Sequence, residues 1–267
     1  TDGFVVSDHG TVNNNNDTYV AWNWKAGTAF SNDASATSIG SIDSTGSVST
    51  KAGFSIISYT GTGSAATVAH GLGAVPTVYI CKARTDTGAD ENWLVYHSKN
   101  TAAPETDYLL LNSNQGTTDD ADAFNDTAPT STVFSIGSFV DISKSGVGYI
   151  AYVFTDIEGF AKHGSYVGNG NSSGPFIYTG FRPAWIMQKK TNNSGHWHMW
   201  DSTRNTSNEV TRYLLANANN SEYTDGGLDI LSNGFKPRKT GTGLNADGDT
   251  YIYLAFAEQP FKYANAR

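Results

Sequence analysis

The chain contains two diverged copies of one unit, and this internal duplication restricts its fold more than any other feature of the sequence. Repeat 1 spans residues 53–160 and repeat 2 spans residues 161–267. Three pairs lie 107 positions apart, and two further pairs lie 104 and 105 apart: Tyr59 and Tyr166, Pro76 and Pro183, Lys82 and Lys189, then Trp93 and Trp197, Asn112 and Asn217. Such a period indicates tandem copies of one supersecondary unit. Tandem copies are more typical of scaffolds, spacers and binding arrays than of an enzyme with one asymmetric site.

Residues 1–27 match the closing part of each repeat. The apolar run at residues 18–24 corresponds to residues 148–154 of repeat 1 and 250–256 of repeat 2, and each run follows a shorter apolar phrase that suggests a hairpin. We therefore expect residues 1–27 to form the C-terminal strands of a preceding β-domain. Because the chain opens on Thr and inside a unit, we interpret it as the C-terminal part of a longer polypeptide.

The composition predicts an all-β protein. Short aromatic and β-branched runs, such as residues 54–59 and 77–80, are bounded by Gly, Asn and Ser, as strands are. No window shows a helical stripe over three turns. We expect two tandem, internally duplicated β-sandwich domains, residues 53–160 and 161–267, each of roughly six to eight strands.

Two polar stretches stand apart from these strands. Residues 28–52 are rich in Ser, Thr and Gly, so we expect a connector there. The alternation at residues 38–42 leaves open that this part lies extended along a neighbouring surface. Residues 117–128 carry four aspartates and predict an acidic surface loop.

The charge excludes some partners and suggests another. A net charge of −8 argues against binding to nucleic acid, and no apolar run is long enough to span a bilayer. Residues 1–160 carry −11 and residues 161–267 carry +3. This asymmetry is either drift between solvated surfaces or a pair of complementary faces for self-association. The single cysteine, Cys81, excludes an internal disulfide and lies in an apolar run typical of a buried thiol.

The best candidate for ligand contact is His196-Trp197-His198-Met199-Trp200. On a strand, His196, His198 and Trp200 share one face because side chains alternate. An aromatic ring beside polar donors suits sugar recognition, two histidines suit a metal, and the matching residues 93–97 favour plain core packing. No third metal ligand is evident nearby.

Other strings that carry chemistry elsewhere lack their required context. His70 has no counterpart in repeat 2 and reads as a residue that stabilises a turn. Residues 170–174 spell G-x-S-x-G, but no helix follows them. The turns at residues 13–17 and 245–249 resemble fragments of calcium loops but lack the closing Glu. The sequence therefore predicts no catalytic residues and no cofactor, with calcium as the one open alternative.

Six phrases resemble the repeated C-terminal region of large structural proteins of bacteriophages, notably marine ones: residues 19–27, 53–61, 70–73, 164–170, 178–185 and 257–267. The resemblance covers nearly the whole chain. It implies a tail-fibre or virion-surface component and supplies no catalytic residues.

These observations together predict a non-enzymatic virion appendage, extracellular, that contacts host surface glycan. Its expected partners are other virion proteins and further copies of itself, as a trimer by analogy with appendages. The alternatives are a secreted or cell-surface bacterial carbohydrate-binding module and, from another class, a polysaccharide depolymerase.

Overall fold

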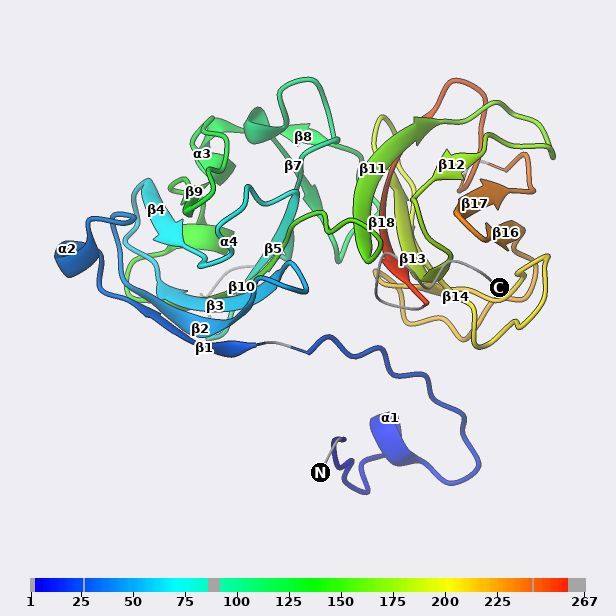
Figure 1. Cartoon of the computed structure of the whole chain (residues 1–267), viewed down its shortest axis with the longest axis horizontal. Helices are drawn as coiled ribbons and strands as arrows, with labels where there is room; N and C mark the ends of the chain where they lie inside the picture. The colour runs from blue at the N-terminus through cyan, green and yellow to red at the C-terminus, as the bar shows by residue number, and fades with distance from the viewer. Residues whose placement is uncertain (1–2, 26, 86–91, 242, 259–267) are drawn as a thin grey trace.

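The computed structural model describes residues 3–25, 27–85, 92–241 and 243–258, and it is an all-β protein of the sandwich type. Figure 1 shows repeat 1 and repeat 2 side by side, with the N-terminal residues extending below them. Every pairing between its strands is antiparallel. No helix among the described residues is long and apolar enough to cross a bilayer.

Repeat 1 packs a small sheet against a large one. The large sheet has, in spatial order, β1 (Thr28–Asn32), β2 (Ser44–Ser49), β3 (Phe54–Thr60), β10 (Gly148–Phe154), β5 (Val78–Ala83), β6 (Leu94–His97), β7 (Asp107–Leu110) and β8 (Thr118–Asp119). The small sheet is the pair β4 (Ala66–Ala69) and β9 (Val133–Ile136). A buried cluster that includes Tyr59, Tyr79 and Phe134 fills the space between them.

Repeat 2 has the same plan. Its large sheet has the order β11 (Ala161–Val167), β18 (Thr250–Ala257), β13 (Pro183–Lys190), β14 (Trp197–Asp201) and β15 (Leu214–Leu215). Its small sheet has the order β12 (Ile177–Tyr178), β17 (Gly234–Pro237) and β16 (Leu228–Leu231). Tyr166, Trp200 and Phe235 belong to the core between these two sheets.

Equivalent residues make equivalent contacts in the two copies. Tyr59 stacks on Tyr149 with ring centroids 5.4 Å apart, and Tyr166 stacks on Tyr251 at 5.0 Å. The hydroxyl of Tyr59 donates to the carbonyl of Ile142 at 2.9 Å, and that of Tyr166 donates to the matching carbonyl of Leu244 at 2.8 Å. The same buried tyrosine pairs thus fix the same strand order twice.

The closing phrase of each repeat is not a hairpin, contrary to expectation. In repeat 1 its first part, β9, pairs with β4, whereas its second part, β10, lies between β3 and β5 in the other sheet. In repeat 2, β17 and β18 separate in the same way. Each part is therefore stabilised by strands that precede it in the chain.

The expected strand pair at residues 1–27 was wrong for its described part. Residues 3–25 form no strand, and their one regular element is the single-turn helix α1 (Gly10–Asn13). The reason follows from the separation of β9 and β10, because both need earlier strands of their own unit as partners. No strand of the described residues pairs with residues 3–25, and an isolated strand pair is marginal in water.

The expected connector at residues 28–52 was also wrong. Strands β1 and β2 extend the large sheet of repeat 1, with β2 paired along β3. Between them, after the one-turn helix α2 (Ala34–Thr37), Ile42 forms a parallel bridge to Val68 of β4 and packs on the core. The alternation at residues 38–42 therefore marked a segment that lies along a neighbouring surface.

The remaining short helices support loops. The acidic stretch contains α3 (Ala121–Phe124), capped by the side chain of Asp120, and Ala123 and Phe124 are buried in the core although Asp122 and Asn125 are exposed. The other two are α4 (Val140–Ser143) and the 3₁₀ turn η1 (Pro104–Thr106). His70 stabilises its turn as expected, accepting from Leu72 N and contacting the carbonyl of Thr130. Cys81 is buried, as expected.

The large sheets of the two repeats pack back to back, and we call this apolar layer the seam. Each copy contributes the same face. Val78 and Ile80 of β5 match Trp185 and Met187 of β13 by the 107-residue spacing. The full buried set is Phe54, Val78, Ile80, Val95, Leu109, Phe154, Ala161, Trp185, Met187, Trp197, Ile252, Leu254 and Phe256. Burial on both faces explains why β10 and β18 read as continuous apolar runs.

Hydrogen bonds also cross the seam, and aromatic rings pack at one end of it. The indole of Trp197 donates to the carbonyl of Leu110 of the other repeat at 2.8 Å, and His97 Nε2 lies 3.2 Å from the carbonyl of Tyr253. At one end, Trp24 packs edge-on against Trp185 with ring centroids 5.1 Å apart. This contact attaches residues 21–25 to the body.

We expect Trp197→Ala to lower the free energy of unfolding by about 3–5 kcal/mol, because it empties a buried indole site and removes the indole N–H that donates to the Leu110 carbonyl. Urea unfolding measures the change. Trp93→Ala is the matched control, since Trp93 occupies the same place in repeat 1 but is only partly buried and should cost clearly less. Equal losses would contradict the asymmetry of the seam.

The protein should lose stability in acid through His97. Burial lowers the pKa of His97 from 6.5 to about 3, so between these values the unfolded chain binds a proton that the folded chain does not. Stability is therefore full above pH 6.5 and falls on acidification by about 1.4 kcal/mol per pH unit for this residue. Urea titrations at several pH values measure the slope, and His97→Gln should reduce it by that amount. An unchanged slope in the variant would assign the acid sensitivity elsewhere.

Candidate functional site

The most developed candidate site is a cavity of about 310 Å³ in repeat 2, which we call the Tyr213 cavity. It lies on the side of β14 that faces away from the seam. Its lining combines aromatic, charged and glycine residues: His198, Trp200, Tyr213, Asp225, Gly226, Lys239, Thr240, Gly241, Gly243 and Leu244.

Strand β14 places two of the three predicted site residues at this cavity. Trp197 and Met199 face the seam, so alternation turns His198 and Trp200 to the opposite side. Trp200 is 0% exposed, so it supports the wall from behind and is not open to solvent. His198 is almost fully buried, and its Nδ1 lies 3.1 Å from the carbonyl of His196.

The third predicted residue, His196, lies outside the cavity. It precedes β14 and is exposed, with Nδ1 3.0 Å from the amide nitrogen of Asn217. In repeat 1 the equivalent Asn92 accepts a bond from Asn112 at 3.0 Å. Because the same pair recurs in both copies, His196 belongs to a loop contact shared by the fold.

Tyr213 is the partly exposed aromatic side chain of the cavity wall. It lies 4.9 Å from Trp200 and 5.2 Å from His198 between ring centroids, and it stacks on Tyr223 at 4.9 Å with an interplanar angle of 8°. The backbones of Tyr213 and Tyr223 also bond to each other at 3.1 and 3.0 Å. The two rings therefore form a rigid, amphipathic platform.

The cavity exists because repeat 2 lacks a phenylalanine that repeat 1 has. In repeat 1 the carbonyl of Phe139 accepts from the backbone of Ile142, and its ring lies 5.8 Å from that of Tyr108. The carbonyl of Gly241 makes the equivalent backbone bond in repeat 2. Tyr213, the counterpart of Tyr108, thus faces open space where repeat 1 is filled.

A second glycine and a histidine complete this difference. Gly243 stands in the place of Asp141, whose buried carboxylate binds Asn92 in repeat 1. A Cβ atom on Gly243 would lie 2.9 Å from the ring of His198, which itself replaces Leu94. The cavity is therefore built from changes at matching positions of the two copies.

Polar groups surround the aromatic platform. Asp225, Lys239 and Thr240 are exposed at the cavity, and the hydroxyl of Tyr213 lies 3.4 Å from the Asp225 carboxylate. Burial, then the charge of Asp225, raises the pKa of Tyr213 to about 12, so this hydroxyl stays protonated. Burial lowers the pKa of His198 to about 4, so this imidazole is neutral at pH 7. The cavity thus offers a carboxylate, an ammonium and neutral donors.

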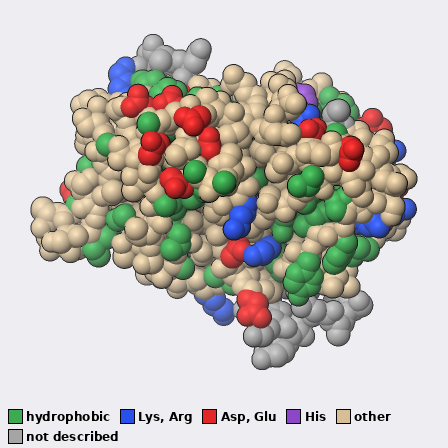
Figure 2. All heavy atoms as spheres, turned by 90° about the horizontal axis from the view of Figure 1, so that it is seen from above, with side chains coloured by type: hydrophobic (Ala, Val, Ile, Leu, Met, Phe, Trp, Pro, Cys, Tyr) green, Lys and Arg blue, Asp and Glu red, His purple; other side chains and the backbone are tan. Residues whose placement is uncertain are grey.

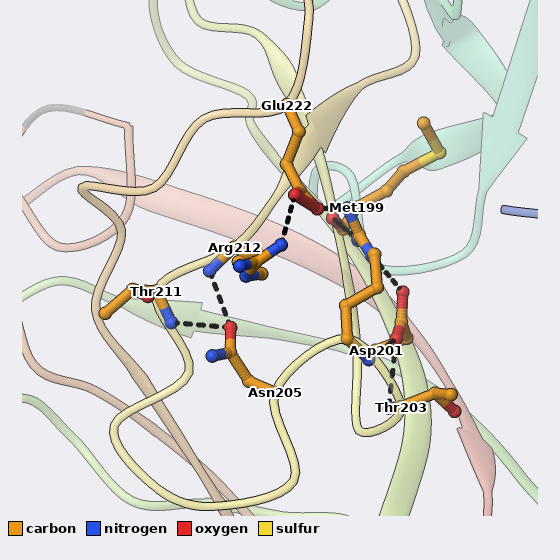
Figure 3. A network of polar contacts seen from close by, with 8 residues as sticks. Met199, Asp201, Thr203, Asn205, Thr211, Arg212 and Glu222 are labelled. Carbon is orange, nitrogen blue, oxygen red and sulfur yellow. Dashed lines mark hydrogen bonds and ion pairs between the residues drawn. The ribbon is translucent and has the colours of Figure 1, made fainter. Parts of the chain in front are cut away.

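An ion-pair network holds the loops that carry the platform, as Figure 3 shows. Arg204 bridges Asp201 at 2.6 Å and Glu222 at 3.0 Å, and Arg212 reaches Glu222 at 2.9 Å. Asn205 accepts from the backbone of Thr211 and Arg212 at 3.2 and 2.9 Å. The network fixes both chain segments that flank Tyr213 and Tyr223.

Sequence reasoning did not identify Tyr213, Asp225, Lys239, Thr240 or the glycines of the cavity. A usable signal was present, because the copies could be compared for positions where a large side chain in one faces a glycine in the other. That comparison requires residues 137–143 to be aligned with residues 238–245, where equivalent positions of the two repeats lie 102 residues apart. The backbone bonds of the two segments supply this spacing, whereas their side chains do not resemble each other.

One further cluster contains the residue types of a catalytic triad, but its geometry stabilises the fold and does not suit catalysis. At the junction of the repeats, Thr77 Oγ1 and Asp156 Oδ1 both contact Nδ1 of His163, at 2.7 and 3.0 Å. A proton relay needs the hydroxyl and the carboxylate on different ring nitrogens. His163 therefore ties the turn between β10 and β11.

The turns that resemble fragments of calcium loops use their side chains for contacts within the protein. Asn245 binds Asn169 and the carbonyl of Asn171, Asp249 pairs with Lys190 at 3.2 Å, and Asn14 binds Asp17. Within the described parts of the chain, no three His, Cys, Asp or Glu side chains gather as a metal site would require.

We expect Arg204→Met to destabilise the protein by about 3–5 kcal/mol, because it leaves the buried carboxylate of Asp201 without its charged partner. Chemical unfolding measures the loss. The double variant Asp201→Asn with Arg204→Met removes the uncompensated charge and should recover part of it. No recovery would mean that Arg204 stabilises the loops through packing alone.

A family model for a domain of unknown function, DUF7483, matches residues 1–260, so the chain belongs to this family. No curated protein and no solved structure matches the chain.

Proposed function

We propose that this chain is a non-enzymatic carbohydrate-recognition module of a larger surface assembly, and that the Tyr213 cavity is its sugar site. The observation that carries the proposal is the open aromatic platform of repeat 2 at the place that Phe139 fills in repeat 1. The rigid seam behind β14 holds this platform in place before a ligand arrives.

The chemistry of the cavity suits a sugar ring. Tyrosine offers an apolar face and a polar hydroxyl, which match the C–H faces and hydroxyls of a pyranose. Asp225, Lys239 and Thr240 supply acceptors and donors around that face. Because Asp225 and Lys239 carry opposite charges, the best ligands are sugars with amino, acetamido or carboxylate groups next to their hydroxyls.

The sequence resemblance to bacteriophage structural proteins supports a place on a virion surface, where such a module would contact host glycan. A secreted or cell-surface bacterial carbohydrate-binding module uses the same cavity chemistry. On a virion and on a bacterial surface alike, the module would attach to a cell by binding its glycan in this cavity. A glycan-binding assay therefore tests the site and not the source organism.

We expect Tyr213→Ala to weaken glycan binding at least tenfold, because it removes the stacking face. Binding is first located on an array of bacterial polysaccharide fragments and then measured by calorimetry. Tyr108→Ala is the matched control, since Tyr108 holds the same position in repeat 1 beneath Phe139 and should leave affinity unchanged. Equal losses of affinity in both variants would indicate that the substitutions act by disturbing the fold.

A cavity-filling variant tests the same site without removing a contact. Nothing lies within 4 Å of a Cβ atom placed on Gly241, and its backbone is not left-handed, so Gly241→Phe should fold and close the cavity as Phe139 does in repeat 1. We expect Gly241→Phe to abolish glycan binding and Gly241→Ala to retain it. Full binding by Gly241→Phe would overturn the site assignment. Release of reducing ends by the unmodified chain would favour the depolymerase alternative.

A further inference from the structure

The residues that precede repeat 1 cover the outer sides of its strands β3 and β4. Strand β2 pairs along β3, with Thr45 opposite Ser58. At the facing edge, the backbone of Ser41 donates to the carbonyl of Thr67 at 2.9 Å, and the hydroxyl of Ser44 donates to that of Ala69. Residues 41–49 thus cross from one sheet to the other and close that side of the sandwich.

The equivalent edges of repeat 2 have no such cover. Strands β11 and β12 are the counterparts of β3 and β4. Beyond the bridge between Ile157 and Ala161 at the start of β11, no strand of the described residues pairs with their outer sides. The backbone N–H of His163 points away from β18, because it donates to Asp156 at 2.9 Å. By the alternation of a β-ladder, the N–H groups of Ser165 and Val167 also point outward.

A groove of about 600 Å³ separates these edges, bounded by residues 156–162 and 178–180. Tyr178, which lines the groove, is 64% exposed. Val167 at the end of β11 and Phe176 just before β12 are 57% and 48% exposed. Seen from above in Figure 2, hydrophobic side chains gather on the repeat 2 half and acidic side chains on the repeat 1 half. We call this region the repeat 2 groove.

The N-terminal residues 3–20, which we call the arm, carry the other large set of exposed apolar side chains. Every residue of the arm is exposed, with Phe4 at 63% and Val5 at 98%. Among the described residues eleven large hydrophobic side chains are exposed, of which six lie on the arm and three lie on or next to β11 and β12. Nine of these eleven side chains thus belong to the arm or to the edge strands of repeat 2.

We propose that the arm of one copy occupies the repeat 2 groove of a second copy and adds a strand along β11. A strand there would satisfy the outward N–H groups of Ser165 and Val167, as β2 does for β3. In Figure 1 the residues that precede β1 extend below the body, and every residue of the arm is exposed, so the arm does not occupy the groove of its own copy. A second copy is therefore the source of the arm in this proposal.

Such an exchange is heterologous, because an arm meets a groove and not a second arm. Heterologous contacts close into a ring when the rotation permits and otherwise propagate as a filament. The contact does not depend on charge, since Lys162 beside the groove already pairs with Asp156 at 2.6 Å. It should therefore persist at high salt.

Light scattering after size-exclusion chromatography tests the proposal on the full 267-residue chain. We expect the full chain to form an oligomer in 0.5 M salt, and the chain without residues 1–20 to be a monomer. Ser165→Pro removes an outward N–H while sparing the ladder with β18, so it should also give a monomer. Thermal unfolding shows whether the Ser165→Pro chain folds. If it does not fold, Tyr178→Lys is the second groove variant, and it should also give a monomer.

Mixing the two defective chains distinguishes this arrangement from others. The arm-deleted chain keeps its groove and the Ser165→Pro chain keeps its arm, so together they should form a one-to-one dimer and nothing larger. An arm-deleted chain that still assembles would indicate pairing of β11 with β11 and overturn the proposal. A monomeric full chain would overturn it as well, with the groove left open or closed by the chain's own residues.

Discussion

The seam between the two large sheets is the contact on which the rest of this structure depends. A β-sheet in water normally buries one face and leaves the other polar, but here the central strands of both sheets are buried on both faces. One face of β18 packs in the core of repeat 2 and the other in the seam. The seam thus converts two small sandwiches into one rigid body and sets the direction of every side chain on β14. Because Trp197 faces the seam, His198 must face the cavity.

The sequence was sufficient for the fold class and for the equivalence of the copies, because both depend on local composition and on residues that recur. Tyr59 and Tyr166 recur because each stacks on a tyrosine of the closing strand and bonds to a buried carbonyl. The path of the non-repeated segments could not be read in this way. Residues 41–49 are polar and look like a connector, and only the uncovered edges of β3, which follows them directly, and of β4, further along the sequence, give them partners.

The candidate site was half predictable for a similar reason. Period-two alternation correctly put His198 and Trp200 on one side of a strand. The alternation could not show that Tyr213 covers Trp200, because the solvent exposure of Trp200 depends on a residue from another part of the chain. Nor could it reveal the cavity itself, which is the absence of a side chain at Gly241. An absence becomes visible only when the filled version, Phe139 against Tyr108, is aligned beside it.

Repeat 1 shows that this fold can form with both the cavity and the groove closed. It closes the cavity with Phe139 and the groove with residues 41–49, whereas repeat 2 does neither within the described residues. Exposed apolar area costs roughly 25 cal/mol for each Å² left in water, so the three exposed side chains on or next to β11 and β12 forgo stabilisation that burial would provide. A copy that kept the shared core and lost two separate closing elements retains its folding contacts in the seam. Its free surfaces are those at which we propose contacts outside the chain, a sugar in the cavity and a neighbouring arm in the groove.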